Sequence, residues 1–242
     1  MGQNTGDQLS PGVINKMHII ELRLQARDLK AQRQFYRDVL TLPVQGGTDG
    51  PLIVGAGRTR LIFEAAEAGT APVYHFAFNI PENRFVEARR WIAARTPLLR
   101  RGKEDEFHFI PWNAHACYFT DAAGNILEFI ARHNLPNASS EPFDGRGILE
   151  VSEIGLPGTT VGEMVAMLEA GPGLALWSGD RESFAAVGDA CGLCIIVPTG
   201  HRWLPDKRIP AAPHPVALTI AGDRDAAYAI PGYPYRINMV QM

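Results

Sequence analysis

Two stretches of the 242-residue sequence place a metal-binding side chain among alternating apolar residues. His75 begins the run His-Phe-Ala-Phe-Asn-Ile, and Glu128 ends the segment 118–128. Successive side chains of a strand point to opposite faces of a sheet, so both residues are predicted on the face away from the apolar core. An imidazole and a carboxylate that share one face of a sheet indicate a binding site for a divalent metal.

An internal repeat supplies a third candidate ligand. The strand pattern at 20–24 and the helical stretch after it resemble the strand that begins at His75 and its following helical stretch, and Glu21 takes the place of His75. Apolar side chains recur at helical spacing in both stretches. They are Leu29, Phe35 and Val39, with Tyr36 and Leu40 alongside, in the first stretch and Phe85, Ala88 and Ile92 in the second. Each unit is therefore predicted to be a strand, a helix and then several strands.

Two such units, with outward ligands on the first strand of each and on the last strand of the second, resemble the vicinal oxygen chelate superfamily. That group includes glyoxalase I, extradiol dioxygenases and the fosfomycin- and bleomycin-resistance proteins. The resemblance covers residues 17–132, and its most specific part is a strand-turn-strand in which Gly124 is expected to supply the positive φ of the turn. It implies an α+β fold of tandem βαβββ modules, whose curved mixed sheets form around a cup.

The resemblance also implies that Glu21, His75 and Glu128 bind the metal, although many relatives carry His where this chain has Glu21. One imidazole and two carboxylates suit Fe, Mn, Ni, Zn or Mg, and the sequence does not choose among these divalent metals. Such a site stabilises an oxyanion on a small molecule with adjacent oxygens. The chain is thus expected to be a glyoxalase-like isomerase or lyase, with Glu128 or Glu21 as the catalytic base.

Two alternatives stay open beside this reading. The same cup with iron(II) would support a ring-cleaving extradiol dioxygenase, because a site with three ligands leaves coordination positions open for oxygen. The other alternative is a protein that binds a drug or another small molecule without catalysis, as the bleomycin-resistance relatives do. A cavity lined by apolar and aromatic side chains would support it.

Further side chains are candidates for contact with the substrate. Tyr118 shares a face with Glu128 by strand alternation, and its hydroxyl could bond a bound oxyanion. Trp112 stands just before that strand and is a candidate for the rim of the pocket. Arg23 and Arg60 are predicted on the ligand face. They are candidates for substrate binding and, equally, ion-pair partners that would hold the carboxylates if no metal binds.

The chain is predicted to divide into two halves. Residues 1–16 are expected to form a disordered tail, 17–133 a glyoxalase-like domain of two units, 134–147 a linker rich in Pro, Gly and Ser, and 148–242 a degenerate second domain. The cluster 201–203 in the second half is a candidate lid over the cup or, alternatively, a cap at the end of a strand.

The second half repeats the pattern with losses. Glu153 mirrors Glu21, but Pro215 stands where His75 would be expected before the next strand. Pro231 and Pro234 then come too soon for a long helix, so the last unit is expected to be truncated. On this basis Glu153 is interpreted as a structural residue and not as a ligand.

Composition narrows the function classes. A formal net charge of −3 and a pI near 6.2, without a basic patch interleaved with aromatic residues, argue against a nucleic-acid partner. The sequence has neither an apolar run long enough to span a bilayer nor a hydrophobic signal core, so a cytoplasmic protein without a membrane partner is expected. Three cysteines argue against a disulfide framework, and the pair Cys191 and Cys194 is interpreted as strand packing. The expected partner is a small-molecule substrate, and a homodimer is compatible with the fold.

Overall fold

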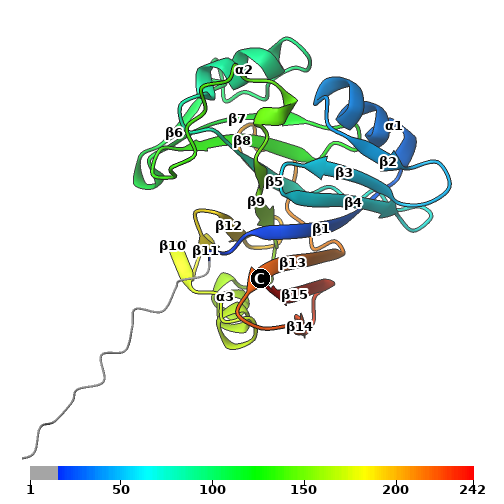
Figure 1. Cartoon of the computed structure of the whole chain (residues 1–242). Coiled ribbons are helices and arrows are strands. Elements are labelled where there is room, and N and C mark those ends of the chain that lie inside the picture. The colour runs from blue at the N-terminus through cyan, green and yellow to red at the C-terminus, as the bar shows by residue number, and fades with distance from the viewer. Residues whose placement is uncertain (1–15) are drawn as a thin grey trace, which may run out of the picture.

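The computed structural model describes residues 16–242, which fold into two curved mixed β-sheets with a few short helices (Figure 1). Of the predicted tail, residues 1–15 lie outside the described residues. The α+β class and the tandem βαβββ organisation that the sequence predicted are confirmed. Among residues 16–242, no helix has the length and apolar character needed to cross a membrane.

Four modules follow one another along the chain. The first consists of β1 (Ile19–Ala26), α1 (Leu29–Gln34), the π-helical turn η1 (Phe35–Val39), β2 (Val44–Gly46), β3 (Leu52–Ala56) and β4 (Thr59–Ala65). The second consists of β5 (His75–Ile80), α2 (Phe85–Ala93), β6 (Phe107–Phe109), the 3₁₀ turn η2 (Ile110–Trp112), β7 (Ala114–Thr120) and β8 (Ile126–Arg132).

The second half contains a complete module and a shortened one. After the 3₁₀ turn η3 (Gly145–Gly147), the third module consists of β9 (Glu150–Gly155), α3 (Val161–Ala170), β10 (Leu176–Gly179), β11 (Ala185–Asp189) and β12 (Gly192–Ile196). The fourth has only β13 (Val216–Gly222), β14 (Ala226–Ala229) and β15 (Tyr235–Gln241). The predicted truncation of the last unit is confirmed, because no helix follows β13 within the described chain.

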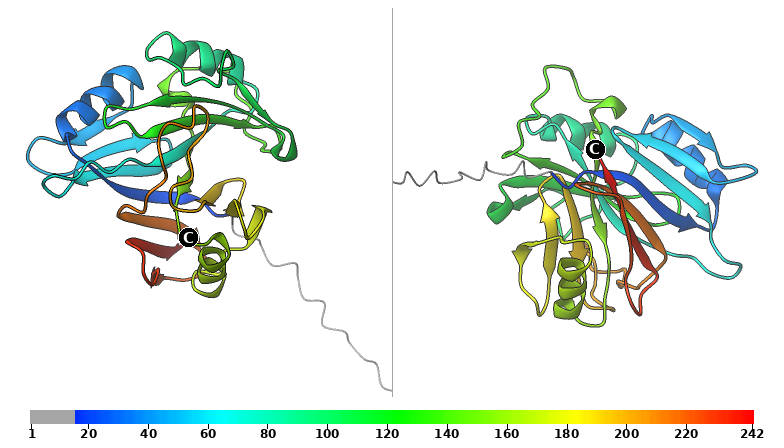
Figure 2. Two further views of the ribbon diagram at one scale, coloured as in Figure 1. Left: turned by 180° about the vertical axis from the view of Figure 1, so that it is seen from behind. Right: turned by 60° about the horizontal axis from the view of Figure 1, so that its bottom comes forward.

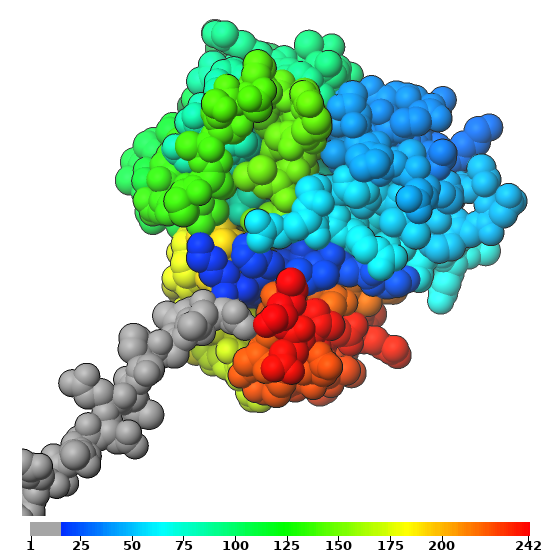
Figure 3. Space-filling view, viewed as in Figure 1, coloured from blue at the N-terminus to red at the C-terminus, as the bar shows by residue number. Residues whose placement is uncertain are grey.

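The modules pair across the two halves of the chain. β1 pairs antiparallel with β13, and β5 pairs antiparallel with β9. Sheet A therefore joins the first and fourth modules in the strand order β14-β15-β13-β1-β4-β3-β2. Sheet B joins the second and third modules in the order β10-β11-β12-β9-β5-β8-β7-β6. In the space-filling view β1, in blue, crosses the surface between the other strands of the first half and the orange and red strands of the fourth module (Figure 3).

Strand alternation gives each sheet two different faces. Phe76 and Phe78 of β5 lie in the main hydrophobic core, whereas Ala77 lies in a second cluster on the opposite face of sheet B. Leu127 and Phe129 of β8 also lie in the main core, as the sequence predicted. Helices α1 and α2 lie on the outer side of their sheets, and the three views place α3 beside the strands of the second half (Figures 1 and 2). The second cluster is therefore free to line a cup.

Local sequence signals account for the ends of several elements. Asp28 caps α1 because its side chain accepts a hydrogen bond from the backbone N–H of Ala31. Gly124 in the turn between β7 and β8 has φ of 83°, so the predicted positive φ is confirmed. The buried Asp121 carboxylate fixes the same turn by accepting the backbone N–H of Ala123 and of Asn125. This tight turn brings the end of β7 back onto β8 and sets the register of Glu128.

Candidate active site

Three side chains that can bind a metal converge on the inner face of sheet B. His75 comes from β5, Glu128 from β8 and Glu153 from β9, and one ligand atom of each lies within 4.8 Å of those of the other two. The His75 Nε2 atom lies 3.7 Å from a carboxylate oxygen of Glu128. All three residues are buried, with at most 7% of their surface exposed. The arrangement offers one nitrogen and two carboxylate donors to a single point.

Strand register explains the convergence. Ala77 of β5 stands opposite Glu128 of β8 on one side and opposite Glu153 of β9 on the other. His75 is two residues before Ala77 and shares its face. The β9 register shifts at this point, since Phe78 faces Val151 while Ala77 faces Glu153, which leaves one extra residue in β9. Such a β-bulge re-aims the strand, and here it turns Glu153 toward the cup.

The hydrogen bonds of His75 fix which ring nitrogen is free. Its Nδ1 atom lies 3.2 Å from the backbone carbonyl oxygen of Ile126, which can only accept a hydrogen bond. Nδ1 must therefore carry the proton, and Nε2 presents its lone pair toward Glu128. Burial lowers the pKa of His75 from 6.5 to about 4, so the ring is neutral near pH 7. A neutral imidazole whose second nitrogen donates to a carbonyl is the usual form of a metal-binding histidine.

The two carboxylates have unequal surroundings. Burial raises the pKa of both Glu128 and Glu153. For Glu153 the rise is opposed by Arg132, whose Nη2 forms an ion pair with Oε1 of that carboxylate. Glu128 has no such partner in direct contact; it accepts a hydrogen bond from Tyr118, and the neighbouring Glu153 raises its pKa further. Arg132 therefore opposes the rise in pKa by direct contact at Glu153 and only at longer range at Glu128.

Arg132 itself is enclosed at the back of the site. It is 1% exposed, and its guanidinium carbon lies 5.1 Å from the ring centre of Trp112 and 5.6 Å from that of Trp177. Within the described chain, its Nε and Nη1 atoms find no hydrogen-bond partner. Its contact with Glu153 is thus its main electrostatic compensation, since cation–π contacts replace only part of the lost hydration.

These three side chains open into a cavity of about 360 Å³. Its remaining walls are mostly aromatic and apolar, and two basic side chains, His201 and Lys207, lie among them. The other lining residues are Phe109, Pro111, Trp112, Tyr118, Phe184, Ile195, Val197, Trp203 and Leu204. The predicted contacts Tyr118 and Trp112 therefore lie in the cavity wall with His75 and Glu128.

A loop between β12 and β13 covers one side of the cavity with Trp203. The ring centre of Trp203 lies 4.9 Å from that of His75. Trp203 can approach the sheet because the residue beneath it is Gly155, where an added Cβ would lie 2.7 Å from the indole. Backbone hydrogen bonds from Trp203 N–H to Ile209 and from Lys207 N–H to Trp203 hold the loop in shape. The cluster 201–203, predicted as a lid, lines the cavity with two of its three members.

The structure does not bring Glu21 to this cluster. β1 belongs to sheet A and β5 to sheet B, so Glu21 and His75 lie on different sheets. The Glu21 carboxylate instead lies 2.6 Å from Arg23 and 3.3 Å from Arg60, and Arg23 also contacts Glu64 at 3.1 Å. Arg23 and Arg60 thus accompany Glu21 on sheet A, outside the cavity that contains His75. This is the ion-pair alternative that the sequence left open for a carboxylate without metal.

Glu153 takes the place in the cluster that was predicted for Glu21. Its position was visible as a repeat of Glu21, yet a repeat does not say which modules pair. Adjacent modules of one half were expected to share a site, whereas the second module pairs with the third. The residue set aside as structural is therefore the third member of the cluster.

No protein-family model matches the sequence, and no curated protein matches it. The fold, in contrast, has many solved counterparts. A candidate dioxygenase from Bacillus subtilis aligns over 93% of this chain and 85% of its own, with a TM-score of 0.59 and 14% identity. A glyoxalase I mutant from Zea mays aligns over 93% of this chain and 94% of its own, with a TM-score of 0.59 and 10% identity, and glyoxalase I from the same plant aligns with a TM-score of 0.51 and 11% identity. The expected architecture is thereby confirmed: the chain has the fold of the vicinal oxygen chelate superfamily.

Proposed function

We propose that the chain is a metal-dependent enzyme of the vicinal oxygen chelate type, with His75, Glu128 and Glu153 as its metal ligands. The observation that carries this proposal is the charge of the cluster. Two buried carboxylates face a neutral imidazole, and one arginine compensates for only one of them. Two carboxylates about 4 Å apart repel each other by roughly 4 kcal/mol at an effective dielectric constant of 20. A bound divalent cation would remove this repulsion.

The donor set fits such an ion. One imidazole nitrogen and two carboxylate oxygens suit the harder divalent metals Fe, Mn, Ni, Zn and Mg. Arg132 contacts Oε1 of Glu153 and leaves Oε2 available. When bound, a divalent metal would act as a Lewis acid on two adjacent oxygens of a substrate.

The unequal carboxylates suggest a division of roles for proton transfer. Arg132 favours the ionised form of Glu153, which suits a fixed ligand. Glu128 has a pKa well above its ordinary value and lies beside the cavity, which suits a group that takes a proton from substrate carbon and returns it. Tyr118 can donate its hydroxyl hydrogen bond to Glu128 or to a developing oxyanion. We therefore favour a glyoxalase-like isomerase or lyase, with Glu128 as catalytic base.

The cavity restricts the substrate. Its wall is predominantly apolar, and Lys207 is its one permanently charged cation among the described lining residues. A substrate with several carboxylates would leave charges without partners, at a cost of several kcal/mol each. We propose a compact molecule with an apolar or aromatic body, two adjacent oxygens near His75 and at most one anionic group near Lys207.

Metal content and turnover test this function together. Untagged protein would be analysed by elemental mass spectrometry, comparing the native chain with His75→Ala and with Glu21→Gln as the matched control on sheet A. We expect one equivalent of divalent metal to be lost in His75→Ala and kept in Glu21→Gln. Turnover would be measured as isomerisation of dicarbonyl–thiol adducts and detected by exchange of the substrate proton with deuterated water. We expect this activity to disappear in Glu128→Gln. Equal metal content in all three proteins would contradict the proposal.

One observation favours ring cleavage as a second candidate. The position on β12 that corresponds to Glu128 on β8 is occupied by Ile195, which stands opposite Gly155 and lines the cavity. The site therefore has three donor side chains and an apolar residue at the fourth position. This leaves coordination positions open for oxygen and for an aromatic substrate. Anaerobic reconstitution with iron(II) followed by catechol and air would produce a coloured ring-cleavage product. An iron-dependent coloured product without exchange of the substrate proton would favour the dioxygenase over the isomerase. If the protein binds no metal but still binds aromatic ligands, a non-catalytic binding protein would be favoured.

A further inference from the structure

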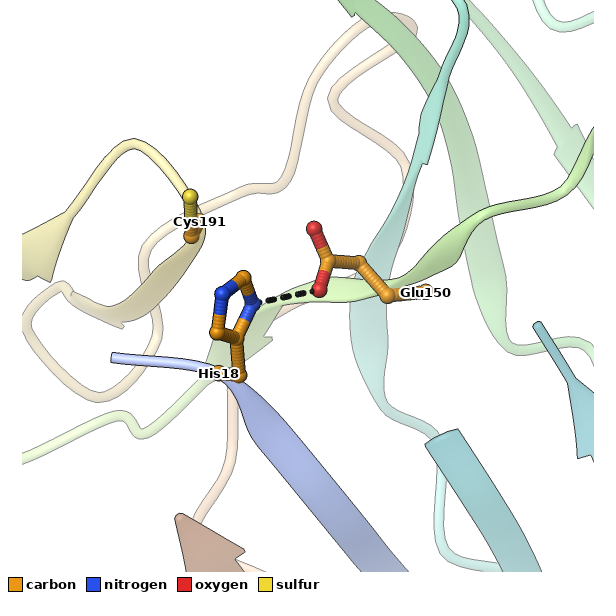
Figure 4. A group of neighbouring side chains, drawn as sticks. All are labelled: His18, Glu150 and Cys191. Carbon is orange, nitrogen blue, oxygen red and sulfur yellow. Dashed lines mark hydrogen bonds and ion pairs between the residues drawn. The ribbon is translucent and has the colours of Figure 1, made fainter. Parts of the chain in front are cut away.

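A second group of metal-binding side chains lies at the other end of β9, outside the cavity. His18 stands just before β1, Glu150 begins β9, and Cys191 lies in the turn between β11 and β12. One ligand atom of each lies within 4.8 Å of those of the other two. Figure 4 shows the His18 ring in contact with the Glu150 carboxylate and Cys191 on the other side of the ring, each residue on a separate element. The group thus combines nitrogen, oxygen and sulfur donors, which the first cluster does not.

The surrounding backbone holds two of these residues in place. The Asp189 carboxylate accepts the backbone N–H of Met17 through one oxygen and that of Cys191 through the other, each at 2.7 Å. It therefore ties the segment before β1 to the β11–β12 turn. An added Cβ at Gly192 would collide with the main chain of Met17, so these segments pack without space between them. His18 and Cys191 are therefore held side by side by the packing and hydrogen bonds of their backbone segments.

Hydrogen bonds to both carboxylate oxygens orient the Glu150 side chain. The side-chain amide of Asn79 donates a hydrogen bond to its Oε1 at 3.2 Å, while Oε2 lies 2.8 Å from Nδ1 of His18. Glu150 is 5% exposed and Cys191 4% exposed, whereas the His18 side chain is 22% exposed. One oxygen of Glu150 is thus directed toward His18, and the group is closed on the side of the sheet and open on the side of His18.

Arg58 is the competing partner of this group. Its guanidinium lies 3.3 Å from Oε2 of Glu150 and 3.2 Å from Nε2 of His18. Its side chain is 55% exposed, so it can turn into solvent at little cost. With Cys191 as thiolate, the group and Asp189 carry three negative charges, and the nearby cations are Arg58 and Lys16. When Arg58 turns into solvent, two negative charges remain uncompensated, and a divalent cation would balance them.

We propose that His18, Glu150 and Cys191 bind one zinc-type ion. Thiolate, imidazole and carboxylate together are the ligands that zinc uses in proteins, and the remaining position faces the open side beside His18. The ion would link the start of sheet A to β9 and the β11–β12 turn of sheet B. Its role is structural: it fastens β1 of sheet A to the strand of sheet B that carries Glu153.

Cobalt(II) titration of the untagged protein tests this site without relying on activity. A cobalt ion bound to a thiolate gives a sulfur-to-metal charge-transfer band in the near ultraviolet, and the cluster at His75 contains no sulfur. We expect the band in the native protein and in His75→Ala, and its loss in Cys191→Ser. Cys194→Ser is the matched control, since Cys194 is a buried strand residue three positions away, and it should retain the band. Zinc added afterwards should displace the cobalt.

Arg58 provides the decisive variant. If the ion and the guanidinium compete for Glu150, Arg58→Gln should strengthen cobalt binding by about fivefold, since an ion pair with a half-exposed arginine is worth about 1 kcal/mol. His18→Ala, at a more exposed residue, should weaken binding while circular dichroism remains unchanged. The absence of a charge-transfer band in both the native protein and Arg58→Gln would overturn the site, and so would a band that survives Cys191→Ser. Neither result would affect the function proposed for His75.

Discussion

The two sheets repeat one strand pattern but present different chemistry on their inner faces. In sheet B the three positions fixed by strand register hold His75, Glu128 and Glu153; in sheet A the corresponding positions hold Glu21, Ile62 and Ala217. Sheet A has a single carboxylate there, and two arginines contact it. Sheet B has two carboxylates and one arginine. The two sheets therefore repeat one geometry, and under the proposed function the charge balance favours a cation in sheet B and none in sheet A.

The exchange of Glu153 for glutamine tests this comparison most directly. Glu153→Gln removes a charged donor from sheet B, and we expect metal binding at His75 to fall by well over 100-fold, because even outer-shell partners of a metal contribute about 10- to 100-fold. Turnover should be lost with it. Glu21→Gln makes the same exchange in sheet A and should leave both unchanged. Metal affinity and rate would be measured on both variants; a larger loss with Glu21→Gln would transfer the site to sheet A.

The arginines of the two sheets should differ in the stability that they provide. Arg132→Leu leaves the buried Glu153 without its partner, and breaking a buried ion pair in this way costs about 3–5 kcal/mol. Arg60→Leu removes a contact of a side chain that is 59% exposed, which is worth about 0–1 kcal/mol. Urea unfolding in the presence of a chelator would measure both. Added metal should restore part of the stability of Arg132→Leu, since the cation replaces the lost charge. Similar losses in the two variants would contradict the comparison.

Protonation of His75 should lower the stability of the metal-free fold at acidic pH. The folded protein keeps this ring neutral down to about pH 4, because burial lowers its pKa from 6.5 to about 4. The unfolded chain takes up the proton near pH 6.5, so the stability due to the neutral ring is present above that pH and is lost as the pH falls toward 4. The full loss amounts to about 3 kcal/mol.

The difference between the native protein and His75→Gln isolates this effect from other histidines. Unfolding free energies of both, measured with a chelator between pH 7 and 4, should converge as the pH falls. Glu128 acts in the opposite direction, since its raised pKa makes the metal-free fold less stable as the pH rises above the ordinary value of 4.5. Parallel curves for the two proteins would show that His75 is not buried as described.

The sequence predicted the face of each strand better than the partner of each strand. Alternation placed Phe76 and Phe78 in the core and His75 on the other face, because a period of two is a local property. Which module pairs with which depends on long-range contacts, and nothing local distinguished Glu21 from Glu153. The bulge in β9 adds a further step that alternation does not encode. Trp203 reaches the site through a loop whose hydrogen bonds are equally invisible in a residue pattern.

The smallest expected effect concerns the cover of the site. At Gly155 of sheet B an added Cβ would lie 2.7 Å from the Trp203 indole, whereas the corresponding position in sheet A is Thr219, which already carries a side chain. Gly155→Ala should push Trp203 away from His75, cost about 1–3 kcal/mol of stability and weaken an aromatic ligand of the cavity by roughly tenfold. Tryptophan fluorescence and ligand titration would report the displacement.

A double variant tests whether the Trp203 indole or the backbone causes the loss of stability in Gly155→Ala. The indole atoms nearest the added Cβ belong to the six-membered ring, Cη2 and Cζ2, which phenylalanine does not reach in the same way. The double variant Gly155→Ala with Trp203→Phe should therefore recover most of the stability lost by Gly155→Ala, measured against Trp203→Phe alone. The added Cβ would also lie 3.3 Å from the carbonyl oxygen of His75. If the double variant recovers nothing, that backbone contact sets the need for glycine, and the cover formed by Trp203 is independent of it.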